Sequence, residues 1–296
     1  MDDNTTISLI EAPPRVSEFR RVVRVFFSRG VVVFGLVIVI VFLLTAAFAP
    51  WIAPYDPYKQ DFDQLLQSPS WQHWLGTDTL GRDTLSRIIY GSRTTLMVGV
   101  IALGIAAIVG MILGLLAGYF GRWTYNVIMR VMDALMAFPM ILLALVIASL
   151  LGGGLRNVMI ALGIALVPGY ARLMCGQVLS VKENDYIVAE HSLGASSLRI
   201  MLKHIFPNCL PPFIVMITMM MGMTMLAEAG LSYLGIGIEP PAAAWGGMIS
   251  DGYSRITRNP LLSFAPGIAI MLVVFSFNMV GDGLRDALDP RLRGTF

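Results

Sequence analysis

Charged side chains inside long apolar runs are the residues of this chain most able to do chemistry. Asp133 lies near the start of one such run, Glu228 near the end of another, and Arg172 near the end of a third. A carboxylate within a membrane can relay protons, whereas one near the membrane surface can reach water or cap a helix. We expect both carboxylates to lie near an interface, and Arg172 to reach the lipid headgroups or to pair with a carboxylate. A proton relay is the alternative.

Methionine forms a second pattern, because the chain has 19 methionines. Four of them share one helical face: Met216, Met219, Met220 and Met223. Thioether sulfur binds soft metals, but flexible methionine side chains more often pack against apolar surfaces or line an adaptable path. All three histidines lie outside the apolar runs, so a nitrogen-ligated metal site has no support. We therefore predict no metal and no cofactor, and we take Met216, Met220, Met223 and Glu228 as candidate residues of a substrate pathway.

Two short glycine–aspartate motifs, Gly76-Thr77-Asp78 and Gly81-Arg82-Asp83, invite comparison with calcium loops. The spacing and the closing glutamate of an EF-hand are absent, so turns are the favoured interpretation. Enzyme motifs are missing as well: the chain has no GxxxxGK[ST] phosphate loop, no HExxH and no GxSxG. An intramembrane aspartyl site at Asp282 would have only Asp133 as a second aspartate. The chain is therefore not expected to hydrolyse ATP by itself.

The elements that position these residues are membrane-spanning helices. Hydrophobic residues make up 56% of the chain and charged residues 14%, with a mean hydropathy of +0.72, whereas about 25% of residues are charged in a soluble domain. Six runs are long enough to cross a bilayer: Val31–Ala49, Leu96–Tyr119, Val131–Leu151, Val158–Met174, Leu210–Ala227 and Leu261–Val280. The fourth is the weakest, because Pro168-Gly169 interrupts it. We predict an all-α membrane protein with six transmembrane helices.

Small residues and cysteines add two expectations about packing. Gly110, Gly114 and Gly118 have the small-xxx-small spacing that lets a membrane helix approach a partner closely. The two cysteines, Cys175 and Cys209, lie in or beside apolar runs, so a disulfide framework is not expected.

Basic residues predict the orientation of the spans. Most lysines and arginines lie in the N-terminal tail, the segment between the second and third spans, the segment between the fourth and fifth, and the C-terminal tail. The positive-inside rule places these segments and both termini in the cytoplasm. The expected division is a cytoplasmic tail (1–30), a first transmembrane helix (31–49), an extracytoplasmic insertion (50–95), a core of five helices (96–283) with a coupling segment at 183–207, and a cytoplasmic tail (284–296). Aromatic, turn-rich sequence in 50–95 and 232–260 predicts membrane-interface belts, a cover for the pathway or a docking surface.

A polar segment between two spans, Asp185–Pro207, predicts two short helices joined at a glycine. Asn184 and Asp185 suit a helix start, and Gly194 suits a left-handed stop. The second helix is expected to end at Pro207, with an apolar face of Leu198, Met201, Leu202 and Ile205, and with Arg199 and Lys203 on the other side. Polar helices of this length between spans favour contact with a cytosolic partner, although a connector lying on the membrane surface is the alternative.

Four motifs resemble the peptide- and nickel-type ABC importer permeases. Gly194 and Pro207 have the spacing of that family's EAA loop, although Val188-Ala189-Glu190 stands where the family has Glu-Ala-Ala. The stretch HWLGTDTLGRDTLSRIIYGSR (73–93) is similar to the entry to its second span. LSYLGIGIEPPAAAWGGM (231–248) is similar to its turn with a double proline, with Glu239 in place of glutamine. GDGLRDALDPR (281–291) resembles the end of its C-type subunit.

The resemblance implies the type I ABC importer permease fold and a role as the C-type permease of a prokaryotic cell membrane importer. Implied partners are a B-type permease, two cytosolic ATPase subunits, an extracytoplasmic substrate-binding protein and the lipid bilayer, with no nucleic acid. The implied ATPase-coupling residues are Glu190, Gly194, Leu198, Arg199 and Pro207. Short peptides, glutathione-like molecules, opines and chelated nickel are the implied substrate classes. A secondary transporter or channel, which needs an ion site and no ATPase, is the rival, and an intramembrane enzyme is a more distant one.

Overall fold

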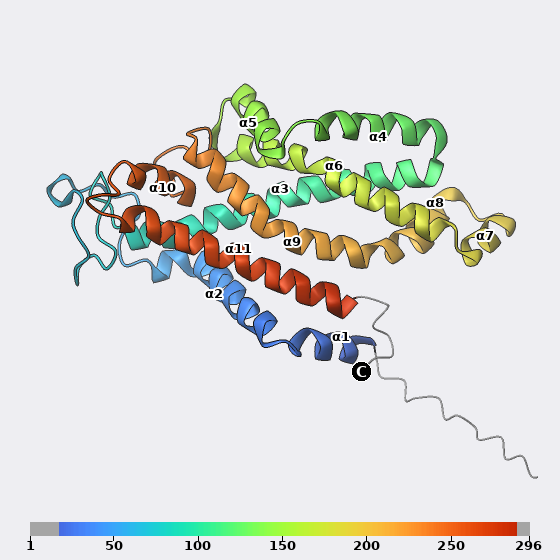
Figure 1. Cartoon of the computed structure of the whole chain (residues 1–296), viewed down its shortest axis with the longest axis horizontal. Coiled ribbons are helices and arrows are strands. Elements are labelled where there is room, and N and C mark those ends of the chain that lie inside the picture. Colours follow the sequence, from blue (N-terminus) through green and yellow to red (C-terminus); the bar gives the residue numbers. More distant parts are fainter. Residues whose placement is uncertain (1–17, 289–296) are drawn as a thin grey trace, which may run out of the picture.

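The computed structural model describes residues 18–288, and in that range the chain is an elongated bundle of helices (Figure 1). Its only strand-like pairing there is a bridge between Thr77 and Asp83. The helices are α1 (Glu18–Phe27), α2 (Gly30–Ile52), α3 (Thr84–Phe120), α4 (Arg122–Met136), α5 (Met140–Leu151), α6 (Gly154–Lys182), α7 (Asp185–Ser192), α8 (Ser197–Arg199), a π-helix (Ile200–Ile205), α9 (Phe206–Tyr233), α10 (Trp245–Tyr253) and α11 (Leu261–Leu288), with a 3-10 turn η1 (Phe62–Gln64).

Five helical segments of the described chain are long and apolar enough to cross a membrane: α2, α3, α6, the run from α8 to α9, and α11. The predicted span Val131–Leu151 is a bent pair instead, because α4 and α5 meet at 91°. Pro139 explains this break, since it lacks an N–H and disfavours helical geometry at the residue before it, Phe138. The bundle therefore has five spans, or six if the bent pair counts as one.

Several predicted boundaries differ from the observed helices. Helix α3 begins at Thr84 rather than at Leu96, because the Asp83 side chain caps it by accepting a hydrogen bond from the Ser86 amide. The predicted N-terminal tail contains α1, and the predicted C-terminal tail begins within α11. The remainder of that tail, 289–296, lies outside the described residues.

Helix α6 is continuous through Pro168, so the predicted interruption there is absent. Its packing against α3 is the most extensive helix–helix contact of the described chain. Gly110, Gly114 and Gly118 of α3 make the contact, and a Cβ at Gly114 would lie 2.4 Å from the Ala171 carbonyl oxygen. The partner of the small-xxx-small face is therefore α6 of the same chain.

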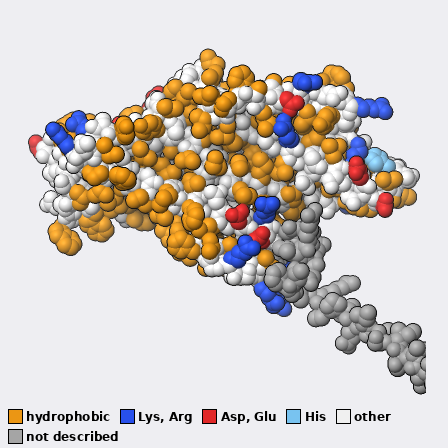
Figure 2. All heavy atoms as spheres, viewed as in Figure 1, with side chains coloured by type: hydrophobic (Ala, Val, Ile, Leu, Met, Phe, Trp, Pro, Cys, Tyr) orange, Lys and Arg blue, Asp and Glu red, His pale blue; other side chains and the backbone are white. Residues whose placement is uncertain are grey.

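The bundle has two distinct ends (Figure 1). The loop end carries residues 53–83, α10 and residues 234–244, and the α7 end carries α7, α8, α1 and the last turn of α11. Figure 2 shows hydrophobic side chains over most of the visible face, with charged side chains at the loop end and in several places over the half nearer the α7 end. This is the distribution of a chain whose middle lies in hydrocarbon.

Candidate functional site

Gly194 ends α7 as the sequence predicts. Its φ of +79° is left-handed, its amide donates to the His191 carbonyl, and the Ala195 amide donates to the Glu190 carbonyl at 3.1 Å. These two bonds form a Schellman motif, which satisfies the last carbonyls of the helix. Asn184 stands at the N-cap position, but its side chain donates to the Val181 carbonyl instead of capping α7. The C-terminal end of α7 is therefore capped, whereas its N-terminal end has no side-chain cap.

Helix α7 is fixed to the ends of α3 and α6. Ile187 is buried, and the His191 ring stacks on Tyr119 with ring centroids 6.2 Å apart. Lys182 Nζ donates to the Tyr119 carbonyl at 2.7 Å and also lies over the Tyr119 ring. Helix α7 therefore contacts the ends of the two helices that share the most extensive helix–helix contact of the described chain.

Glu190 links α7 to the π-helix. Its Oε1 lies 3.5 Å from His204 Nε2, and its side chain is mostly buried. The predicted coupling residue therefore faces inward, toward the segment that follows Gly194. Its contact joins the two halves of the coupling segment.

The second half of the segment differs from the prediction in two ways. Pro207 does not end a helix, because the π-helix continues into α9 with Pro207 in its first turn, where a missing N–H is tolerated. The wider π-turn also shifts the buried face to Ile200, Met201 and Ile205. Leu198 and Leu202, predicted as part of that face, are exposed. Met201 and Ile205 are therefore buried as predicted, whereas the prediction is wrong for Leu198 and Leu202 and for the helix end at Pro207.

Apolar side chains are exposed on the surface of the α7 end. Four of them form the α7 patch, with exposed fractions of 57%, 84%, 62% and 54%: Val188, Leu193, Leu198 and Leu202. Arg199 is exposed beside them. Large apolar side chains exposed at the polar end of a membrane bundle are candidates for contact with a protein partner. Val188 and Leu193 were not among the predicted coupling residues, and their only signal in the sequence is a large apolar residue within a polar segment.

A cavity of about 430 Å³ between α4 and α6 and another of about 600 Å³ along α9 open on the surface of the bundle. The second is lined by Met216, Met219 and Met220 of α9, by Leu173 of α6 and by Arg285 of α11. Two of the predicted pathway residues thus share one cavity. Pro207 lines it as well.

The other two predicted pathway residues lie elsewhere. Met223 is exposed and does not line the methionine cavity. Glu228 is fully buried, and its Oε1 accepts a hydrogen bond from Ser232 at 2.7 Å. Glu228 does not reach water, because the chain folds back over it after α9: the Ile238 amide donates to the same Ser232 hydroxyl. Its expected position near a membrane interface stays a prediction.

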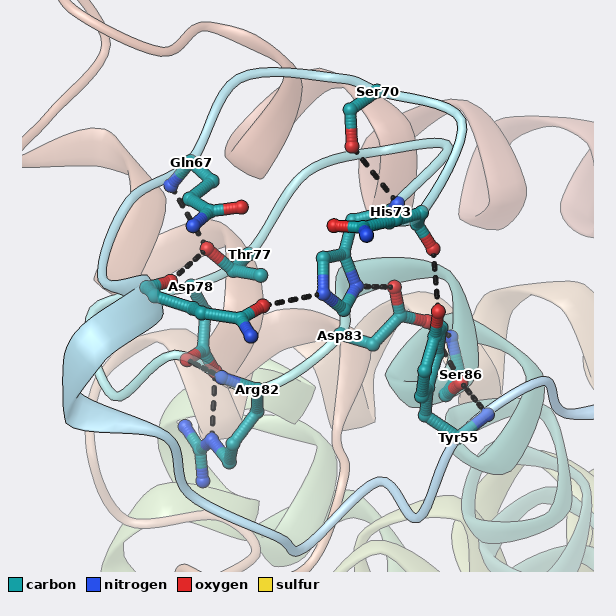
Figure 3. A network of polar contacts seen from close by, with 11 residues as sticks. Tyr55, Gln67, Ser70, His73, Thr77, Asp78, Arg82, Asp83 and Ser86 are labelled. Atoms are coloured by element: carbon teal, nitrogen blue, oxygen red, sulfur yellow. Dashed lines mark hydrogen bonds and ion pairs between the residues drawn. The ribbon is translucent and has the colours of Figure 1, made fainter.

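The loop end is built on a buried polar network (Figure 3). His73 Nδ1 lies 2.8 Å from Asp83 Oδ1, and His73 Nε2 lies 2.8 Å from Gln64 Oε1. The second oxygen of Asp83 accepts from the amide and the hydroxyl of Ser86, and that hydroxyl accepts from the Tyr55 amide. The network joins residues 55–83 to the first turn of α3.

A second set of charges extends the network toward α10. Asp78 Oδ2 lies 2.7 Å from Arg82 Nε and 3.4 Å from Arg87 Nε, and Arg87 also donates to the carbonyl of Pro241. Burial raises the pKa of Asp251 in α10, while Arg82 and Arg87 oppose that rise. Gly76 and Gly81 have left-handed φ values, so both motifs are turns. Within residues 18–288, no group of three or more His, Cys, Asp or Glu side chains is arranged to hold a metal ion.

Comparisons with known proteins agree with this architecture. The family described as "Binding-protein-dependent transport system inner membrane component" matches residues 110–294, and the "N-terminal TM domain of oligopeptide transport permease C" matches residues 17–69. A solved structure of the MetNI methionine ABC transporter in inward-facing conformations has a TM-score of 0.57 at 18% identity, over 69% of this chain and 96% of that chain. The predicted importer permease fold is confirmed.

Three named relatives align with most of the chain. The dipeptide transport system permease protein DppC of Alkalihalophilus pseudofirmus is 43% identical, over 94% of this chain and 91% of that protein. The glutathione transport system permease protein GsiD of Pectobacterium atrosepticum is 39% identical over 97% and 96%, and GsiD of Escherichia coli O6:K15:H31 is 43% identical over 86% and 85%. The chain therefore belongs to the family of binding-protein-dependent transport system inner membrane components, as a multi-pass ABC importer permease.

Proposed function

We propose that this chain is the C-type half of a heteromeric importer of short peptides or glutathione-like molecules. A B-type permease would complete the pathway, two cytosolic ATPase subunits would power it, and an extracytoplasmic binding protein would deliver substrate. The observation that carries the proposal is the α7 patch, an apolar surface held on a helix that is fixed to α3 and α6. The dipeptide and glutathione systems named for its relatives support the substrate class.

The mechanism follows from this attachment. ATP-driven closure of the docked ATPases displaces α7, and the Tyr119 and Lys182 contacts pass the displacement to α3 and α6. Because α3 and α6 are packed closely through glycines, they move as a unit relative to α9 and α11. Such rocking of packed helices exposes one site alternately to the two sides of the membrane. Met216 and Met220 give the path along α9 an adaptable apolar wall.

The orientation of the bundle is part of the proposal, with the α7 end in the cytoplasm and the loop end outside. The excess of lysine and arginine in the segments at the α7 end supports it. Trp71 and Trp74, which are exposed at the loop end, then suit contact with the binding protein. Both termini are cytoplasmic in this arrangement.

Cysteine labelling in intact cells tests that orientation. An impermeant maleimide added from outside is expected to label Asp63→Cys, which is exposed at the loop end, and to spare Ser196→Cys, which is exposed at the α7 end. Permeabilised cells provide the control, because both variants must then react. Labelling of Ser196→Cys from outside would show that the α7 end is not cytoplasmic.

Replacing Leu193 by serine tests the α7 patch. Because Leu193 is 84% exposed and makes a large part of the patch, Leu193→Ser is expected to reduce ATPase co-purification roughly ten-fold, as loss of an apolar anchor does at an interface. Leu150→Ser is the matched control, since Leu150 is 83% exposed at the end of α5. Pull-down of the tagged permease pair measures the retained ATPase. A tagged chain that purifies and transports without any ATPase would favour a secondary transporter.

A further inference from the structure

The cavity between α4 and α6 is lined by charged side chains of both signs, whereas the methionine-lined cavity has no carboxylate in its lining. Arg130 and Asp133 reach it from α4 and Arg172 reaches it from α6. Asp133 Oδ1 lies 2.6 Å from Arg172 Nη2, and the two side chains are 53% and 52% exposed. The expectation that Arg172 pairs with a carboxylate is therefore met by a pair that remains open to a cavity of about 430 Å³.

The position of the Asp133–Arg172 pair along α6 indicates what surrounds the opening of the cavity. Helix α6 has 29 residues, and Arg172 lies about 6 Å past its midpoint at 1.5 Å of rise per residue. A hydrocarbon core about 30 Å thick, centred on α6, would enclose this position. Half-exposed charges at that depth are costly against lipid, so the cavity must open to water or to protein.

The break between α4 and α5 lies next to the same pair. Asp133 is in the last turn of α4, and the Ala137 amide donates to its carbonyl just before the 91° bend. Broken helices near the middle of the membrane are where transporters place substrate sites, because unpaired backbone groups and charged side chains are available there. The cavity thus combines a broken span, an open ion pair and a position at membrane depth.

We propose that this cavity binds the two free termini of a short peptide, an inference that rests on the proposed function. A peptide at neutral pH carries one ammonium and one carboxylate group. The Asp133 carboxylate would accept hydrogen bonds from the ammonium, and the planar Arg172 guanidinium would donate two parallel hydrogen bonds to the carboxylate. Without substrate the two side chains satisfy each other, and a half-exposed pair of this kind opens at little cost.

The side chains that line the two cavities favour the α4–α6 cavity, rather than the methionine-lined cavity, as the site for the peptide termini. The lining of the methionine cavity includes one charged side chain, Arg285, so it offers no carboxylate to an ammonium group. Arg130 gives the α4–α6 cavity a second guanidinium and a net positive charge, which suits peptides with an additional carboxylate. Both cavities share α6, through Leu173 on one side and Arg172 on the adjoining side.

Single substitutions test the subsite in the reconstituted complex of both permeases, the ATPases and the binding protein. Asp133→Asn and Arg172→Gln are each expected to lower uptake of a labelled dipeptide roughly ten-fold, the effect of losing a charge-assisted hydrogen bond to substrate. Binding-protein-stimulated ATP hydrolysis should persist, because α7 is untouched. Asp286→Asn is the matched control, since it breaks another half-exposed pair, Arg29–Asp286, at 2.7 Å. Wild-type uptake in both cavity variants would overturn the proposal.

A charge swap separates substrate binding from a structural role. If the pair only ties α4 to α6 or to the second permease, Asp133→Arg combined with Arg172→Asp restores uptake. If the pair orients the peptide termini, the swap reverses the site and uptake remains low. Restored uptake would therefore overturn the proposal.

A direct binding readout makes this inference independent of transport. Asn126 is exposed and lines the cavity, so Asn126→Cys in a cysteine-free background is expected to react with maleimide. Saturating dipeptide should slow that reaction several-fold, whereas the N-acetylated dipeptide amide, which has neither charge, should not. Protection without uptake by the complex would contradict the proposed function alone. Uptake without protection would contradict the subsite alone.

Discussion

Replacing Gly194 by valine is expected to lower substrate uptake by the reconstituted complex roughly ten-fold, because a β-branched residue resists left-handed geometry by about 1–2 kcal/mol. The φ of +79° and the Schellman bonds of Ala195 and Gly194 would then be lost together. Since a Cβ at Gly194 meets nothing within 4 Å, the substitution causes no clash, and the packed spans stay folded. The consequence is a misdirected π-helix and a disrupted α7 patch. ATP hydrolysis stimulated by the binding protein should fall in parallel with uptake.

Two further variants isolate the cause. Gly152→Val imposes the same strain at a φ of +94° with equally open surroundings, but it lies after α5 and away from the α7 patch. It is expected to keep most of the uptake. Gly194→Asn should retain more activity than Gly194→Val, because asparagine tolerates left-handed geometry. Equal uptake by wild type and Gly194→Val at matched expression would show that the turn does not transmit motion.

Replacing Gly114 by leucine is expected to prevent stable folding of the bundle. Even a Cβ there would lie 2.4 Å from the Ala171 carbonyl oxygen and 2.6 Å from the Met174 Cβ. Backbone on the opposing helix cannot move aside, so α3 and α6 must separate. Because this is the most extensive helix contact of the described chain, the loss is expected to exceed about 3 kcal/mol. Thermal unfolding in detergent, followed by fluorescence or by retention on a size-exclusion column, measures it.

Gly104→Leu is the matched control on the same helix. A Cβ at Gly104 meets nothing within 4 Å, so this variant should fold and elute like the wild type. A Gly114→Leu protein with a wild-type unfolding temperature would mean that α3 and α6 are not in this register. The pair of variants therefore tests the small-residue packing rather than helix propensity, since both exchange glycine for leucine in the same helix.

Local backbone requirements were the features most readily predicted from the sequence. Gly194 was predicted as a left-handed stop, and Gly76 and Gly81 were assigned to turns, because glycine is the residue that adopts positive φ without strain. Long apolar runs likewise predicted the spans. These signals are local, so they do not depend on contacts with the rest of the chain.

Features that depend on tertiary contacts were predicted less well. The burial of Glu228 arises because the chain folds back after α9 and places Ile238 near Ser232, a contact that no local pattern announces. The apolar face of the coupling segment was partly misplaced because a π-helix changes the residue spacing that a regular helix assumes. The sequence predicts a helix end at Pro207, although proline is also favoured in the first turn of a helix.

The pairing of Asp133 with Arg172 also depends on a tertiary contact. The sequence predicts that Arg172 reaches the headgroups or pairs with a carboxylate, but no local pattern identifies Asp133 as its partner, since the two residues are 39 positions apart in the chain. Only the packing of α4 against α6 brings the two together. The charged cavity between these helices therefore became visible with the structure.

Uptake by a fully reconstituted complex distinguishes an ATP-driven importer from an ion-driven transporter. Proteoliposomes would contain this chain, the second permease and both ATPase subunits, with ATP on the ATPase side and labelled dipeptide on the other. The account predicts accumulation that requires ATP and the binding protein together, and that is lost when either is omitted. Accumulation driven by an ion gradient in the absence of ATPases would contradict it.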